Sequence, residues 1–121
     1  MKKLLIIVAS VLASLGVVYF VYTTDTPEIR VVNLTQHSVE QVIVNLPSSR
    51  VSFSDIPSQS NVSIFYSKIQ VPGQYHYLIT LNQGQQLSGR CGRVRPHELG
   101  KLLTLIVEQD GQVTCKESSK L

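Results

Sequence analysis

The sequence lacks the compact motifs by which many enzymes are recognised. It has no Gly-x-Ser-x-Gly elbow for a nucleophilic serine and no glycine-rich loop for a phosphate group. Its eight carboxylates are scattered, and no spacing among them predicts a catalytic pair. The three histidines, His37, His76 and His97, lack the close spacing of metal ligands. We therefore expect no enzyme, no metal site and no cofactor.

The chain also has no large excess of either positive or negative charge. The chain carries 11 Lys and Arg residues against 8 Asp and Glu residues, a formal net charge of +3. Lys2 and Lys3 stand at its start, so nine basic residues face eight acidic ones in the rest, a net charge of +1. Domains that bind nucleic acid are usually strongly basic. We expect no nucleic-acid partner.

Only two cysteines occur, Cys91 and Cys115. They lack C-x-x-C spacing and a neighbouring histidine, which argues against a redox or metal pair. In an oxidising compartment such a pair predicts a disulfide. Closing a loop of about 25 residues would stabilise the fold by roughly 3–4 kcal/mol in the chain-entropy model.

One long apolar run organises the rest of the chain. Lys2 and Lys3 precede 19 uncharged residues, 4–22, which span roughly 28 Å as a helix, close to the hydrocarbon thickness of a bilayer. A cleaved secretory signal is one interpretation, with small-residue sites near residues 11–13 or 14–16. An uncleaved signal anchor is favoured, because the run stays apolar to Tyr22 and ends in aromatic residues. No cysteine follows the run, which excludes a lipoprotein anchor, and no pilin-type glycine–glutamate pattern heads it.

The basic start predicts the topology. The two lysines hold the amino terminus in the cytoplasm, so the remainder is exported. A Met-Lys-Lys start before a Leu/Ile run is typical of a bacterial protein. We predict a cytoplasmic tip (1–3), an inner-membrane anchor (4–22), a linker (23–28) and one periplasmic domain (29–121). Cleavage would instead release that domain into the periplasm.

The exported part is predicted to be all-β. Eight short runs rich in Val, Ile, Tyr and Phe are separated by turn residues at nearly regular spacing. They are residues 29–34, 39–46, 50–54, 62–69, 75–81, 86–90, 102–108 and 112–116. This pattern predicts a small immunoglobulin-like antiparallel β-sandwich of about seven or eight strands. Residues 96–100 are expected to form a turn or a single helical turn, although residues 99–106 also fit a helix face.

Period-two alternation predicts which side chains face the core. The predicted core residues are Val42, Val44, Leu46, Val51, Phe53, Val62, Ile64, Tyr66, Tyr75, Tyr77, Ile79 and Leu81. His76 lies between two of these tyrosines and is therefore expected to face outward.

Turn chemistry predicts the register of two hairpins. A three-residue loop that ends in a left-handed glycine fits residues 82–84 and 109–111. The pairs that follow are Ile79 with Leu87, Tyr75 with Cys91, Val107 with Val113, and Leu105 with Cys115. Both registers turn a cysteine toward the core, where the two would meet between strands.

One segment is locally basic. Arg90, Arg93, Arg95 and Lys101 are opposed only by Glu98, a local charge of +3. One interpretation is a contact for an anionic partner, which would be lipid headgroups, a polyanionic envelope polymer or an acidic protein face. The other is a solvated loop whose charges keep a sheet edge from pairing with other chains.

The same segment constrains its strand. Continued alternation from Cys91 would bury Arg93 and Arg95, and burying unpaired guanidinium groups is very costly. The strand is therefore predicted to end or twist away by about Gly92, which leaves both arginines on a loop.

These features predict a non-enzymatic, membrane-anchored periplasmic binding module, an accessory or assembly subunit of a cell-envelope complex. An alternative is an inhibitor or immunity protein acting on an envelope enzyme or toxin. A third is a small hydrolase whose site is not visible in the sequence. Similarity in plan to exported immunoglobulin-like domains does not by itself imply a function.

Overall fold

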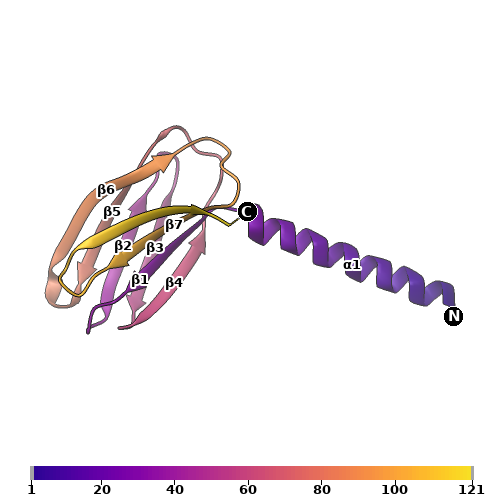
Figure 1. The fold of residues 1–121 in the computed structure, drawn as a ribbon, viewed down its shortest axis with the longest axis horizontal. Helices are drawn as coiled ribbons and strands as arrows, with labels where there is room; N and C mark the ends of the chain where they lie inside the picture. The colour runs from indigo at the N-terminus through magenta and orange to yellow at the C-terminus, as the bar shows by residue number, and fades with distance from the viewer. Residues whose placement is uncertain (1, 121) are drawn as a thin grey trace.

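The fold is one long helix followed by a β-sandwich (Figure 1). The structure, a computed structural model, describes residues 2–120, with side chains for residues 2–19 and 25–120. Helix α1 (Lys2–Asp25) leads directly into the first strand through Thr26 and Pro27. The strands are β1 (Glu28–Asn33), β2 (Val39–Asn45), β3 (Arg50–Ile56), β4 (Ser60–Phe65), β5 (Gly73–Leu81), β6 (Gln86–Val94), β7 (Lys101–Val107) and β8 (Val113–Ser119).

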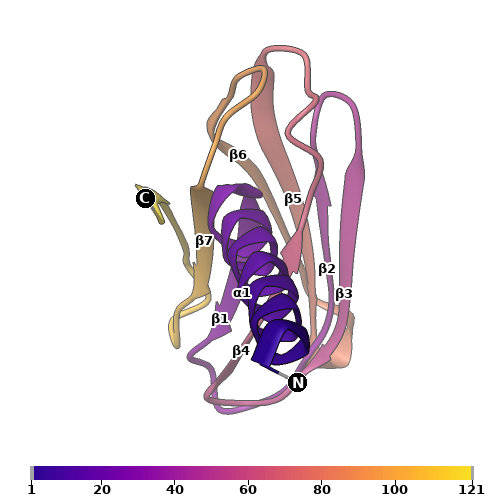
Figure 2. The same cartoon turned by 90° about the vertical axis from the view of Figure 1, so that its right-hand side faces the viewer.

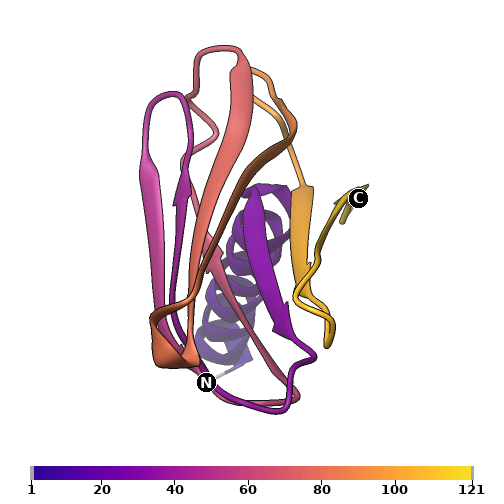
Figure 3. The same cartoon turned by 90° about the vertical axis from the view of Figure 1, so that its left-hand side faces the viewer.

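Each of the eight predicted strands is present, and residues 96–100 contain turns and bends as expected. The fourth strand, predicted at residues 62–69, ends at Phe65, and residues 66–69 lie in the following loop. The strands build two four-stranded sheets, in the orders β4-β1-β7-β8 and β3-β2-β5-β6. Figures 2 and 3 show these sheets as two layers, with β2, β3 and β5 on one side and β1 and β7 on the other.

The pairing corrects two details of the prediction. Strands β1 and β7 are parallel, so the sandwich is not wholly antiparallel. In an immunoglobulin domain the first two strands are neighbours in one sheet, whereas here β1 and β2 lie in different sheets. Strand β1 pairs instead with β4 and β7, which lie far from it in the sequence and whose pairing no local pattern specifies.

Inward-facing side chains of both sheets form the core, as alternation predicted. Among the predicted residues, Tyr75, Ile79, Val42 and Val44 are fully buried. Tyr77 and Leu81 are partly buried and pack against the core. Ile64 is 39% exposed, contrary to the prediction. It lies on β4, an edge strand with a neighbouring strand on one side only.

The two predicted hairpin registers are confirmed. Tyr75 pairs with Cys91 and Ile79 with Leu87, while Leu105 pairs with Cys115 and Val107 with Val113. Gly84 and Gly111 have φ values of 82° and 84°, the left-handed conformation that this loop type requires.

The strands define two ends of the sandwich. The helix-proximal end consists of residues 25–27, 46–49, 66–72, 95–100 and 119–120. The far end consists of residues 34–38, 57–59, 82–85 and 108–112. Lys120 Nζ donates to the carbonyl of Thr26 at 2.7 Å, so the chain returns to the helix after β8 (Figure 1).

Candidate functional site

A disulfide closes one side of the sandwich. Cys91 on β6 and Cys115 on β8 are bonded, with their Cα atoms 6.4 Å apart. Strands β6 and β8 are edge strands of different sheets, so the bond holds the two layers together. The opposite pair of edges, β3 and β4, is joined by the short connection at residues 57–59. The predicted disulfide is therefore confirmed, and it braces the edge that carries the basic segment.

A β-bulge at Gly92 explains how the arginines leave the core. Tyr75 pairs with Cys91, but Gly73 pairs with Val94, so two residues of β6 stand opposite one residue of β5. Gly92 has φ 64°, and after it Val94 faces inward and is 1% exposed. Of the two predicted outcomes, β6 does not end at Gly92 but turns away there, because the bulge reverses the alternation. The strand continues to Val94, so Arg93 lies on the strand and not on the predicted loop. Arg93 and Arg95 are exposed, as the argument from burial required.

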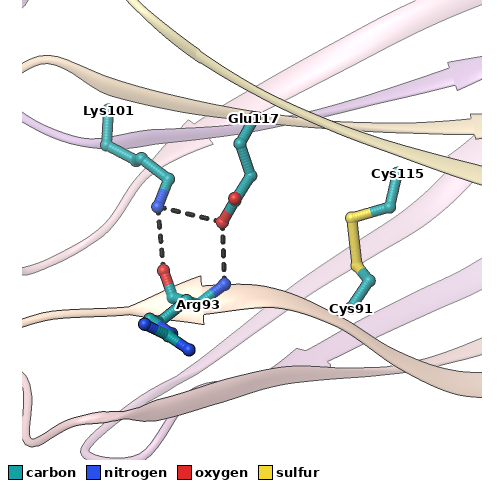
Figure 4. The surroundings of a disulfide bond; sticks show 5 residues. All are labelled: Cys91, Arg93, Lys101, Cys115 and Glu117. Atoms are coloured by element: carbon teal, nitrogen blue, oxygen red, sulfur yellow. Dashed lines mark hydrogen bonds and ion pairs between the residues drawn. A yellow bond between two sulfur atoms is a disulfide. The ribbon is translucent and has the colours of Figure 1, made fainter.

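Lys101 does not share the arginines' surroundings. Its ammonium group lies 3.0 Å from Glu98 Oε2 and 3.1 Å from Glu117 Oε1, and it donates to the carbonyl of Arg93 at 2.9 Å. The Lys101 side chain is only 12% exposed, and its Nζ lies 5.6 Å from the centre of the Tyr75 ring. Lys101 therefore ties β6, β7 and β8 together at the helix-proximal end (Figure 4).

Glu117 completes this link from β8. Its Oε1 accepts a hydrogen bond from the backbone amide of Arg93 at 2.8 Å (Figure 4). Burial acts to raise the pKa of Glu117, but the Arg93 amide and the Lys101 ammonium outweigh it and hold that pKa below its usual value. The carboxylate is thus an ionised strut between the two edge strands.

Two tyrosine hydroxyl groups form a buried pair beneath this strut. The hydroxyl oxygens of Tyr66 and Tyr75 are 2.6 Å apart, and their rings meet edge to face. Burial raises the pKa of Tyr66 to about 12 and raises that of Tyr75 well above its usual range. Both therefore stay neutral, and one hydroxyl donates a hydrogen bond to the other.

The basic segment thus divides in two. Arg90 and Arg93 are exposed on the outer side of β6, and Arg95 is exposed just beyond the end of that strand; we call the surface of these three residues the arginine face. In Figure 4 the Arg93 guanidinium points to the side of β6 opposite Lys101 and Glu117. Among the described side chains, the ion pairs involve Arg30 and Lys101 but none of these three arginines.

The Lys101 network was missed at the sequence level, although a signal existed. The confirmed register that turns Cys115 inward also turns Glu117 inward, two residues later. A carboxylate turned toward the other sheet favours a nearby cation, and Lys101 starts the paired strand. The basic character of the segment favoured treating all four cations alike.

The histidines contribute no visible site. His37, His76 and His97 are all exposed, and His76 faces outward as predicted. Within residues 2–120, no group of three or more His, Cys, Asp or Glu side chains is placed to hold a metal ion.

Comparison with known proteins gives a fold similarity only. No family model matches the sequence, and no curated protein matches it. A solved structure, determined by NMR, of a protein from Eubacterium rectale is similar, with a TM-score of 0.52 and 13% sequence identity. The similarity covers 78% of this chain and 90% of that one. At this identity it concerns the arrangement of the strands.

Proposed function

We propose that this protein is a non-enzymatic binding module anchored in the bacterial inner membrane by α1. The amino terminus lies in the cytoplasm, and the disulfide-bridged sandwich lies in the periplasm. There it serves as an accessory or assembly subunit of a cell-envelope complex. The partner is a protein that presents an acidic face.

The anchor is supported by the surface of α1. The described part of this helix is apolar on all sides, and its large side chains from Leu4 to Tyr19 are 48–71% exposed. A soluble helix would cover such side chains against a core. The helix is also long enough to cross a membrane. The Cys91–Cys115 disulfide fits an exported domain, because such bonds persist in oxidising compartments.

The arginine face is the observation that carries the binding proposal. Two guanidinium groups stand on the outer side of an edge strand and a third stands just beyond its end, on a backbone held by the disulfide and the Lys101 network. A guanidinium group recognises carboxylates through two parallel hydrogen bonds. A rigid row of such groups suits an acidic protein surface.

Site-specific photo-cross-linking in cells tests this function. The cross-linker replaces Ser88, which is exposed and lies two residues before Arg90 on the same side of β6. A second variant carries it at Ser52, on the outer side of β3 at the opposite edge of the sheet. We expect one membrane-protein adduct from position 88 and none from position 52.

Charge variants provide the control. The triple change Arg90→Gln/Arg93→Gln/Arg95→Gln should abolish the adduct. The change Arg30→Gln/Arg50→Gln/Lys116→Gln removes the same charge from other strands and should preserve it. An adduct that survives loss of the arginine face contradicts the proposed contact. An adduct with a soluble hydrolase or toxin would instead support the alternative function, an inhibitor or immunity protein that acts on that enzyme or toxin.

A further inference from the structure

The end of α1 fixes the depth of the helix-proximal end in any bilayer that the helix spans. Residues 4–22 match the hydrocarbon thickness, and Asp25, the last helical residue, lies three residues or about 5 Å beyond Tyr22. The headgroup layer adds about 5–8 Å on each side of the hydrocarbon. Groups that contact Asp25 therefore lie at the depth of the headgroups.

Two loops of the sandwich are held at this depth. The amide of Gly100 donates to the carbonyl of Asp25 at 2.7 Å, which fixes the 95–100 loop. The amide of His97 in turn donates to the carbonyl of Lys68 at 2.8 Å, which ties the 66–72 loop to its neighbour. The backbone thus places both loops beside the helix end.

These loops expose large apolar side chains there. Ile69 is 69% exposed and Leu99 is 51% exposed. A shallow groove of about 580 Å³ lies between the helix end and the 66–72 loop, and Ile69 and Phe65 line it together with Pro27. Apolar surface at this place would be favourable within the interface of a bilayer, where it leaves water.

The charges of the two ends are opposite. The helix-proximal end and the two strand residues that adjoin it on each strand contain Arg50, Lys68, Arg93, Arg95, Lys101 and Lys120 against Asp25, Glu28, Glu98 and Glu117. The far end and its adjoining strand residues contain four carboxylates, Glu40, Asp55, Glu108 and Asp110, and no lysine or arginine. The positive end is therefore the one that faces the membrane, and anionic headgroups attract it.

We propose that the helix-proximal end is a membrane-docking surface for anionic phospholipids of the same bilayer. Ile69 and Leu99 insert among the headgroups, and Lys68 contacts the lipid phosphates. This inference rests on the proposed anchor, because α1 brings the surface to the bilayer. Docking would fix the tilt of the sandwich and so the height and direction of the arginine face.

The absence of tryptophan from the chain allows a direct test. Single tryptophans replace Ile69, Leu99 or, as a far-end control, the exposed Gln109. Each full-length variant is reconstituted into vesicles of phosphatidylethanolamine and phosphatidylglycerol that contain acyl-brominated lipid, which quenches nearby indole. We expect Trp emission at positions 69 and 99 to be blue-shifted and quenched several-fold more strongly than at position 109.

A charge variant tests the lipid class. Lys68→Gln should weaken quenching at position 69 in anionic vesicles, whereas Lys116→Gln, an exposed residue on β8, should leave it unchanged. In vesicles that contain phosphatidylcholine as the only headgroup class, Lys68→Gln and Lys116→Gln should give the same quenching at position 69. No effect of Lys68→Gln contradicts recognition of anionic lipid.

Flotation of the vesicles distinguishes failure of the membrane anchor from failure of the docking surface. A protein that does not float with the vesicles contradicts the anchor itself. A protein that floats, yet whose tryptophans at 69 and 99 emit like that at 109, retains the anchor and overturns the docking surface.

Discussion

Gly92 lies against Glu117: a Cβ atom at Gly92 would come within 2.6 Å of Glu117 Oε1. Gly92 also has φ 64°, which disfavours any other residue. The bulge that turns the arginines outward and the strut that joins the two sheets thus depend on one position without a side chain.

Gly92→Ala should therefore destabilise the fold more than a change at an ordinary left-handed glycine. The backbone conformation costs about 1–2 kcal/mol, and displacement of Glu117 Oε1 weakens its hydrogen bond from the Arg93 amide, which adds about 0.5–1.5 kcal/mol. Gly111→Ala is the control, because Gly111 has φ 84° with open space around its Cβ position. Chemical unfolding of the full chain in detergent micelles measures both free energies. Equal losses would mean that Glu117 is not held beside Gly92.

The tyrosine pair should behave as one unit. Tyr66→Phe or Tyr75→Phe leaves the partner hydroxyl buried without a hydrogen bond, at a cost of about 1–3 kcal/mol each. The double variant should lose less than the sum, because no unsatisfied hydroxyl remains. Unfolding free energies of the three variants complete the cycle. Additive losses would contradict the hydrogen bond.

Lys101 and the arginine face should differ in their effect on stability. Replacing all three arginines by Gln should change the free energy of unfolding by less than about 1 kcal/mol, because they are exposed. Lys101→Gln should cost about 1–3 kcal/mol, because it leaves Glu98 and Glu117 without their cation. Thermal unfolding of both variants tests the division. A larger loss for the arginines would place them inside the fold.

Glu117 should make stability sensitive to acid. Its pKa is lowered in the folded protein, so its contribution is fully present above the unfolded value of about 4.5 and is lost as pH falls through the folded value. In Glu117→Gln the fall in unfolding free energy between neutral and acid pH should be smaller. Glu40→Gln, at an exposed position, is the matched control and should retain the wild-type slope. Identical slopes for both variants would contradict the ionised strut.

Local pattern was sufficient for the strands and for both hairpins. The glycines at 84 and 111 set the loop type, and alternation then carried the register to Cys91 and Cys115, 24 residues apart in the sequence. Each step depends on residues close together in the chain, where turn geometry and burial determine the result.

Features that depend on contacts between distant strands could not be predicted from the sequence. The parallel pairing of β1 and β7 joins residues more than seventy positions apart, and no local signal specifies it. The prediction that β6 ends or twists away by about Gly92 did not identify the bulge, because either outcome removes Arg93 from the core. Lys101 lies with the arginines in sequence, but Glu117 of another strand draws it inward.

The mass of the protein extracted from the membrane fraction, without reductant, tests the central claim most directly. If the chain is anchored and exported, we expect one species that retains Met1 and residues 4–22. Its mass should be lower than that of the reduced chain by two hydrogens, because Cys91 and Cys115 are bonded. A soluble chain that begins near Ser14 or Val17, or a membrane-bound chain with two free thiols, would contradict it.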